Sequence, residues 1–247
     1  MAAVTLLRTE GLCRYFDGLR AVDGVSFSLD AGEIRAIIGP NGAGKTTFVS
    51  LICGRVLPTA GRIAFEGRDI SALPAFRRVG LGIAYTFQIT SIFGNLTVFD
   101  NVALAVQNSM QRTGGSGLWL DEREMAARVA DALDRVGLTE RHDTRASALS
   151  YGHQRLLEVA MGLALSPKLL ILDEPTQGLS DAEIAGFCDL VREIAKDATV
   201  LLIEHNMDVV MDLASRITVM NNGTILSEGT PDEVRADEAV QRAYLGT

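Results

Sequence analysis

The sequence predicts an α/β fold in which a mainly parallel sheet carries an N-terminal antiparallel β subdomain and an inserted α-helical subdomain. Nearly continuous aliphatic runs at residues 169–172 and 199–203 are typical of parallel strands buried on both faces. Short alternating runs in the first quarter of the chain are typical of antiparallel strands with one solvated face. Apolar residues at helical spacing over residues 96–111 and 121–136 predict two helices between these regions.

The N-terminal part combines both kinds of strand. Alternating runs at residues 25–29 and 62–65, which are set off by glycines, predict antiparallel strands. The apolar run at residues 33–38 differs from them, because it enters a glycine-rich turn over residues 39–44 and is followed by a helical pattern over residues 45–53. We therefore expect a strand, a glycine-rich loop and a helix in direct succession.

The C-terminal part completes the predicted sheet and closes the fold. Residues 217–220 predict a further strand, and residues 231–245 predict one or two closing helices. Thr230 is expected to cap the first of these helices, with Pro231 as its first residue.

Composition and charge exclude several classes of protein. The chain has 247 residues, of which 47% are hydrophobic and 22% are charged, as in a globular protein with a core. Acidic residues outnumber basic ones by 31 to 23, and the net charge of −8 has the wrong sign for binding nucleic acid. No apolar window approaches the ~20 residues of a membrane span, and the N-terminus lacks the apolar core of a signal peptide. We expect an intracellular chain that reaches a membrane only through a partner.

The glycine-rich turn carries a phosphate-binding pattern. Residues 39–46 are Gly-Pro-Asn-Gly-Ala-Gly-Lys-Thr, which satisfies Gly-x-x-x-x-Gly-Lys-Ser/Thr between a predicted strand and helix. Backbone N–H groups of such a loop surround the β- and γ-phosphates, toward which the following helix directs its positive dipole end. Lys45 is expected to contact the β/γ oxygens and to take part in catalysis, and Thr46 is expected to hold Mg²⁺. The predicted nucleotide-binding residues of the loop are Gly39, Pro40, Asn41, Gly42, Ala43, Gly44, Lys45, Thr46 and Thr47.

Two carboxylates and a histidine follow the later strands. Asp173 and Glu174 end the aliphatic run at residues 169–172, where two charges are costly unless a cation or a proton donor meets them. Asp173 is predicted to help hold Mg²⁺, and Glu174 to act as the base for the attacking water. His205 follows the strand expected at residues 199–204, beside the phosphate-loop strand, and is predicted to sense the γ-phosphate.

A further motif indicates a family. Residues 149–154 are Leu-Ser-Tyr-Gly-His-Gln, where ATP-binding subunits of ABC transporters carry a Leu-Ser-Gly-Gly-Gln signature. Together with the phosphate loop and the Asp173-Glu174 strand, this motif makes the chain resemble that family over nearly its whole length. The resemblance implies ATP and Mg²⁺ as cofactors and a single ATPase domain over residues 1–247. In it, residues 1–88 and 156–247 would form the P-loop NTPase core, and residues 89–155 the helical subdomain with the signature.

The resemblance also assigns residues that no spacing argument supplies. It implies that Ser150 and Gly152 open a helix that contacts the γ-phosphate of ATP held by a second chain. It places Phe16, with Tyr15 as the alternative, against adenine. It makes Gln88 a ligand of both Mg²⁺ and the attacking water.

The chain departs from the family pattern at three positions or stretches. Tyr151 replaces a signature glycine and His153 replaces a glutamine, which alters the outer face of the motif and leaves the phosphate contacts in place. After Pro175 the usual Ser-Ala-Leu-Asp-like turn is absent, so either Ser180 or Asp181 is expected to cross the interface between two chains.

One copy of the motif set implies that two chains pair head to tail, as a homodimer or with a related ATPase. The resemblance further implies transmembrane permease subunits as partners, a periplasmic or extracellular binding protein as an indirect partner, and a peripheral location on the cytoplasmic face of the inner or plasma membrane. The contact surface for the membrane subunits is expected near residues 89–102, at an apolar group formed by Ile92, Phe93, Leu96, Val98 and Phe99.

Finer features point to one branch of the family. The stretches at residues 154–158, 203–210 and 243–246 are similar to the ATPases of branched-chain amino acid uptake systems. Importers of urea and short amides and the lipopolysaccharide-transport ATPase share parts of this form and remain alternatives. A soluble P-loop kinase is the alternative from a different class, and the signature at residues 149–154 argues against it.

Overall fold

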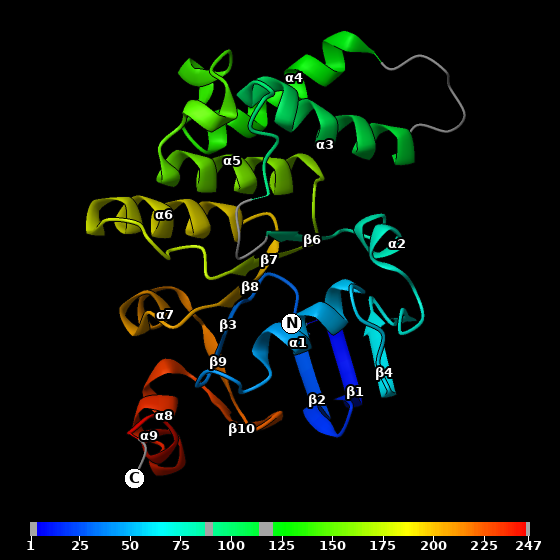
Figure 1. Ribbon diagram of the computed structural model, residues 1–247, viewed down its shortest axis with the longest axis vertical. Helices are drawn as coiled ribbons and strands as arrows, with labels where there is room; N and C mark the ends of the chain where they lie inside the picture. The colour runs from blue at the N-terminus through cyan, green and yellow to red at the C-terminus, as the bar shows by residue number, and fades with distance from the viewer. Residues whose placement is uncertain (1–3, 87–90, 114–120, 246–247) are drawn as a thin grey trace.

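The computed structural model describes residues 4–86, 91–113 and 121–245, and the helices and strands below lie in these ranges. An antiparallel sheet and a mainly parallel sheet form the lower body in Figure 1, and a group of helices stands above them. None of the helices in the described ranges has both the length and the apolar character that crossing a membrane requires.

The antiparallel sheet comes from the N-terminal part of the chain. Its order is β2-β1-β4-β5, and β1 pairs with both β2 and β4. Alternating burial along its strands turns one face toward the core, as the sequence predicts. The strands are β1 (Thr5–Phe16), β2 (Leu19–Asp30), β4 (Ala60–Phe65) and β5 (Arg68–Asp69).

The second sheet has the order β10-β9-β3-β8-β7-β6 and is parallel except for the hairpin that β9 and β10 form. Successive residues of its central strands enter different cores, since Leu170 and Leu172 belong to one apolar cluster and Leu169 and Ile171 to another. The prediction of parallel strands buried on both faces is confirmed. The strands are β3 (Ile34–Ile38), β6 (Ile83–Thr86), β7 (Leu169–Asp173), β8 (Thr199–Ile203), β9 (Arg216–Asn221) and β10 (Thr224–Gly229).

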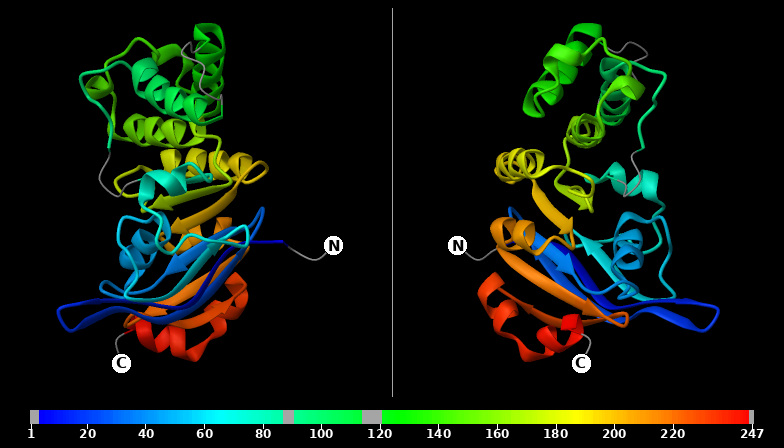
Figure 2. Two further views of the ribbon diagram at one scale, coloured as in Figure 1. Left: turned by 90° about the vertical axis from the view of Figure 1, so that its right-hand side faces the viewer. Right: turned by 60° about the vertical axis from the view of Figure 1, so that its left-hand side comes forward.

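Helices cover the parallel sheet and extend the molecule at one end. In Figures 1 and 2 the green segments, which include α3, α4 and α5, form that end. The helices are α1 (Lys45–Cys53), α2 (Ala75–Val79), α3 (Val98–Thr113), α4 (Glu122–Arg135), α5 (Tyr151–Ala164), α6 (Asp181–Ile194), α7 (Met207–Leu213), α8 (Pro231–Ala236) and α9 (Glu238–Leu245), with short 3₁₀ turns at Thr139–Arg141 and Ala146–Ala148.

Capping side chains explain where the predicted helices begin. α3 starts two residues later than expected from its apolar pattern, because the Thr97 hydroxyl accepts the Asp100 N–H at 3.0 Å. Asp121 caps α4 by accepting the backbone N–H of Arg123 at 2.9 Å. Thr230 caps α8 with Pro231 in its first turn, as predicted. The closing segment is two helices because Asp237 ends α8 and accepts from the first turn of α9.

The expected boundary between residues 155 and 156 falls inside α5, which is a single helix. Its side chains pack with those of α3 and α4 and also with Leu170 of the parallel sheet. The division of the chain into a nucleotide-binding core and a helical subdomain therefore remains a proposal, with α5 joining the two parts.

Candidate functional site

The phosphate loop connects β3 to α1, as the sequence predicts. Neighbouring backbones approach it so closely that two of its glycines admit no side chain. A Cβ on Gly39 would lie 2.1 Å from the carbonyl oxygen of Met220, and one on Gly44, at φ 98°, would lie 2.2 Å from that of Ala21. Gly44 also caps α1 without a side-chain bond. The first N–H groups of the helix are therefore available to an anion.

Lys45 is the first residue of α1 and folds back over the loop. Its Nζ donates to the carbonyl oxygens of Gly39 at 2.6 Å and of Pro40 at 3.1 Å. Burial lowers the pKa of the Lys45 ammonium, and the charges of Glu174 and Asp173 oppose this shift. Phosphate oxygens would replace neutral carbonyl acceptors with charged ones, which are stronger partners for an ammonium.

A cleft of ≈ 590 Å³ lies above the loop. It is lined by residues 41–47, by Leu19, Arg20 and Ala21 of β2, by Glu174 and by Asn222. The cleft thus joins three separate stretches of the chain around the phosphate-binding residues. Nothing in the local sequence pattern marks Leu19, Arg20 or Asn222 as part of this site.

Phe16, the predicted adenine contact, is not among the described residues that line this cleft. It lies across the β1–β2 turn, paired with Leu19. Phe16 is 39% exposed, and its ring stacks with the Arg14 guanidinium, which lies 4.4 Å from the ring centroid. Tyr15, the alternative, donates its hydroxyl to Asp23 at 2.7 Å. Contact between Phe16 and adenine stays a prediction, and Leu19 is the apolar side chain inside the cleft.

Asp173 is the last residue of β7 and is buried. The hydroxyl of Tyr85, on the neighbouring strand β6, donates to its Oδ2 at 2.6 Å. Burial raises the pKa of the Asp173 carboxyl, and the bond from Tyr85 opposes that rise. Tyr85 is a site residue that was not predicted from the sequence. The available signal was a hydroxyl-bearing aromatic on the strand that ends just before the helical insert.

Glu174 lies at the turn after β7 with a left-handed backbone, at φ 48°. Such a conformation is uncommon outside glycine and occurs often at functional sites. Its N–H donates to the carbonyl of Ile203, the last residue of β8, at 2.8 Å. His205 lies just beyond that strand, with its Nδ1 3.9 Å from the Oε1 of Glu174. The structure therefore brings together two residues predicted from separate motifs, because β7 and β8 are parallel neighbours.

The signature segment, residues 149–154, is not part of the described lining of the phosphate-loop cleft. Ser150 caps α5, with its Oγ 2.7 Å from the Nδ1 of His153. Gly152 is buried, and a Cβ on it would lie 2.3 Å from the Oε1 of Glu183 in α6. Among the described residues, those that line the phosphate-loop cleft include neither Ser150 nor Gly152. His153, which is expected on the outer face of the motif, is partly exposed and contacts the capping serine.

The N-terminus of α6 carries the two interface candidates. The N–H and the hydroxyl of Ser180 both donate to the Oε2 of Glu183, at 2.9 and 2.7 Å. Asp181 is exposed in the first turn of α6. Both side chains are exposed, and Ser180 is engaged within its own helix cap, so which of the two meets a second chain stays a prediction.

Two further expectations concern the insert. Gln88 lies outside the described residues, so its role as a ligand stays a prediction. The apolar group expected at the membrane-subunit surface is divided, since Phe93 is 55% exposed whereas Val98 is 0% exposed. The expectation for Val98 is wrong, because the first turn of α3 packs into the core shared with α5.

A family model described as ABC transporter matches residues 22–177, which include the phosphate loop, the signature and both carboxylates. The chain belongs to this family. A second model, described as Branched-chain amino acid ATP-binding cassette transporter, matches residues 224–247. Membership makes the chain an ATPase of the transporter class and confirms the sequence-based resemblance.

Relatives of known class match the whole ABC domain. The chain is 40% identical to the high-affinity branched-chain amino acid transport ATP-binding protein LivG of Salmonella typhimurium, over 98% of each chain. It is 36% identical to BraF of Pseudomonas aeruginosa, which has the same description, again over 98% of each. A nucleotide-free ATP-binding cassette from an ABC transporter superposes with a TM-score of 0.87 at 31% identity, covering 98% of this chain and 100% of the other. These matches confirm the predicted α/β ATPase fold.

Replacing Lys45 by Ala is expected to weaken ATP binding by about 10- to 100-fold, which is the loss of affinity typical when a hydrogen bond to a charged group is removed. The reason is that Lys45 is a loop cation half-buried beside the cleft of this ABC domain. Calorimetric titration with ATP measures the effect. Lys168→Ala is the matched control, because Lys168 is an exposed lysine that pairs with Glu66. Equal affinities of the two variants would contradict the assignment.

Proposed function

We propose that this ABC chain is the ATP-hydrolysing subunit of an importer for branched-chain amino acids. The observation that carries the proposal is the match of residues 224–247 to the branched-chain amino acid cassette model. That stretch lies outside the matched ATPase region of residues 22–177, so it adds information that ATP binding alone does not require. It comprises β10, α8 and α9, at the end of the molecule opposite the helical insert (Figure 1).

In the proposed mechanism, the loop N–H groups and Lys45 hold the β- and γ-phosphates in the cleft. Glu174, which lines that cleft, takes a proton from the attacking water. His205, from the end of the next strand, contacts the γ-phosphate and reports its presence. The pairing of β7 with β8 supports this division of roles, since it holds the two side chains at the same edge of the sheet.

Mg²⁺ fits the donor set at this site. Thr46 offers a hydroxyl from the first turn of α1, and Asp173 offers a carboxylate, both oxygen donors of the kind Mg²⁺ prefers. Burial disfavours the charged form of Asp173, and a nearby cation would favour it. When bound, Mg²⁺ neutralises charge on the phosphate oxygens. Tyr85 orients the Asp173 carboxylate by its hydrogen bond.

A second chain completes each site in this proposal. Neither Ser150 nor Gly152 is among the described residues that line the cleft of their own phosphate loop. Ser150 is exposed at the start of the signature helix, which is therefore available to a nucleotide held by a partner. ATP would close such a pair, and hydrolysis would reopen it. The movement passes to permease subunits through the exposed part of the insert, which includes Phe93, with the chain at the cytoplasmic face of the membrane. A binding protein outside the membrane supplies the amino acid.

Deleting the gene is expected to abolish uptake of radiolabelled leucine, isoleucine and valine, because no permease movement occurs without ATP hydrolysis. Re-expression of the wild-type chain should restore uptake, and re-expression of Glu174→Gln should not. Loss of urea uptake with normal amino acid uptake would assign the chain to the short-amide importers. Normal uptake of both with an outer-envelope defect would assign it to lipopolysaccharide transport.

A further inference from the structure

Glu204 is a buried carboxylate that the proposed hydrolysis does not use. It lies between Ile203, the last residue of β8, and His205, and its side chain is 0% exposed. Removing a carboxylate from water is costly unless hydrogen-bond donors surround it. The environment of Glu204 therefore indicates what the group does.

Four donors from two segments meet this carboxylate. Its Oε1 accepts the N–H of Thr176 at 3.1 Å and also the Thr176 hydroxyl. Its Oε2 accepts the N–H groups of His205 at 2.9 Å and of Asn206 at 3.1 Å. One side chain thus joins the turn after β7 to the turn after β8.

These two turns carry the two groups proposed to act on ATP. Thr176 follows Glu174 by two residues, and His205 is bonded directly through its backbone. The Nδ1 of His205 lies 3.9 Å from the Oε1 of Glu174. A bond from Glu174 N–H to the Ile203 carbonyl joins the same two turns at a second point.

We propose that Glu204 is a positioning residue that fixes Glu174 and His205 relative to each other for hydrolysis. This inference rests on the proposed function, in which those two residues act on the water and the γ-phosphate. Hydrogen bonds to an ionised acceptor are stronger than neutral ones, so the carboxylate holds both turns with little freedom. A displacement of about 1 Å in a reacting group can cost about 100-fold in rate.

The substitution Glu204→Gln tests this with almost no change of shape. A carboxylate only accepts, whereas an amide presents one oxygen and one NH₂ group. The amide must place its NH₂ group at one of the two oxygen positions. At either position the NH₂ group meets at least one backbone N–H donor, so one of the two turns loses its hydrogen-bond acceptor. ATP binding depends on the phosphate loop, and Glu204 is not among the described residues that line the cleft, so ATP binding should be retained.

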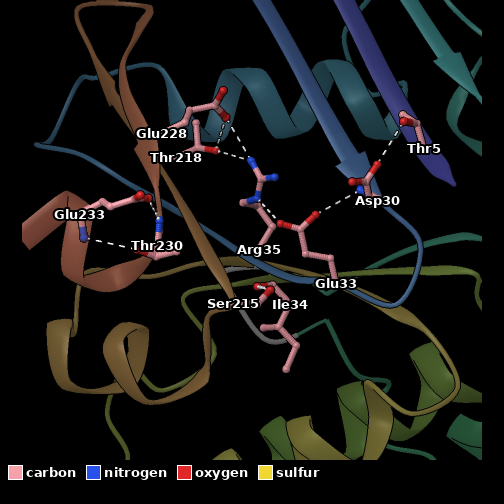
Figure 3. A network of polar contacts seen from close by, with 10 residues as sticks. All are labelled: Thr5, Asp30, Glu33, Ile34, Arg35, Ser215, Thr218, Glu228, Thr230 and Glu233. Carbon is pink, nitrogen blue, oxygen red and sulfur yellow. Dashed lines mark hydrogen bonds and ion pairs between the residues drawn. The ribbon is translucent and has the colours of Figure 1, made fainter. Parts of the chain in front are cut away.

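The network in Figure 3 supplies a matched control for loss of stability. Glu33 is 9% exposed and accepts from the N–H of Asp30 at 3.1 Å and from the Nε of Arg35 at 2.6 Å. It precedes β3 (Ile34–Ile38), whereas the phosphate loop follows that strand. Five extended residues separate the two ends by about 16 Å at roughly 3.3 Å per residue. Glu33→Gln therefore perturbs a buried carboxylate away from the cleft.

The experiment measures kcat and KM for ATP and the thermal unfolding midpoint in the full-length chain. For Glu204→Gln we expect kcat to fall about 10- to 100-fold, with KM changed less than about twofold. For Glu33→Gln we expect a lower unfolding midpoint with kcat within about twofold of wild type. Thr176→Val, which removes only the hydroxyl donor, should give an intermediate fall in kcat. If Glu204→Gln does not fold, the kcat of Thr176→Val tests the positioning role of Glu204 in its place.

Equal kcat values for the wild-type chain and a folded Glu204→Gln would overturn the inference, as would falls in kcat that Glu33→Gln matches. Glu174→Gln in the same assay separates the two levels of argument. If that variant hydrolyses ATP normally, the proposed role of Glu174 fails. If it is inactive while Glu204→Gln and Thr176→Val are normal, only the positioning role of Glu204 fails.

Discussion

Replacing Glu174 by Gln is expected to slow ATP hydrolysis by about 10²- to 10⁴-fold, which is the rate contribution typical of a positioned general base. The glutamine amide cannot take a proton from water, although it keeps the shape of the side chain. Glu174 lines the cleft beside the phosphate loop, whereas Asp173 is buried and bonded to Tyr85. Of these two carboxylates, Glu174 is therefore the one that we expect to meet a water at the γ-phosphate.

Steady-state phosphate release and calorimetric ATP binding measure the two halves of this prediction. ATP affinity should change little, because Lys45 and the loop N–H groups are untouched. Glu193→Gln is the control, since Glu193 is an exposed carboxylate that pairs with Lys196 on the far part of α6. Normal turnover by Glu174→Gln would remove Glu174 from the mechanism.

Adding Ser150→Asp to the Glu174→Gln chain is expected to abolish ATP-dependent pairing of two chains. Asp caps a helix as well as Ser does, so α5 should keep its N-terminus. The new carboxylate would face the γ-phosphate of the partner's ATP, and such a like-charge contact costs of the order of several kcal/mol. Each chain alone should bind ATP with near-normal affinity, because Ser150 does not line its own cleft.

Size-exclusion chromatography with and without ATP measures pairing, with a related ATPase added if the chain does not pair with itself. Ser150→Asn is the matched control, because Asn caps equally well without adding charge. A lost affinity in the isolated chain would place the signature in its own site, and a persistent dimer would show that Ser150 does not face phosphate. Ser150 suits this test better than Gly152, where a side chain would first meet Glu183 of its own chain.

Most helices and strands were predictable because the local apolar patterns match the faces that the elements bury in the tertiary structure. The helix at Lys45–Cys53 and the strand at Thr199–Ile203 have the predicted bounds. Where bounds shifted, a capping side chain such as Thr97 decided the helix start. Strand β2 runs longer than the alternating segment at residues 25–29 predicts, because it pairs along its full length with β1.

Some residues of the site were predictable from local sequence motifs, and others depend on contacts between distant segments. Contiguous motifs gave the phosphate loop, Asp173 and Glu174, since their chemistry requires neighbouring residues. The sequence also predicted that His205 would lie near the loop, because aliphatic strands indicate a parallel sheet. The hydroxyl of Tyr85 on a strand before the insert is only a weak local signal, and Glu204 carries none. The roles of both residues depend on hydrogen bonds to residues 88 and 28 positions away, respectively.

The sequence by itself determined the fold class, the nucleotide chemistry and the family. A glycine-rich turn before a helix, or carboxylates after an aliphatic strand, follow from physics that acts over a few residues. Only the tertiary structure decided that Val98 is core while Phe93 is surface, that Leu19 enters the cleft, and that one buried carboxylate joins the Glu174 and His205 turns. These outcomes depend on which distant segments pack together, because burial and hydrogen-bond geometry belong to pairs of segments and not to either segment alone.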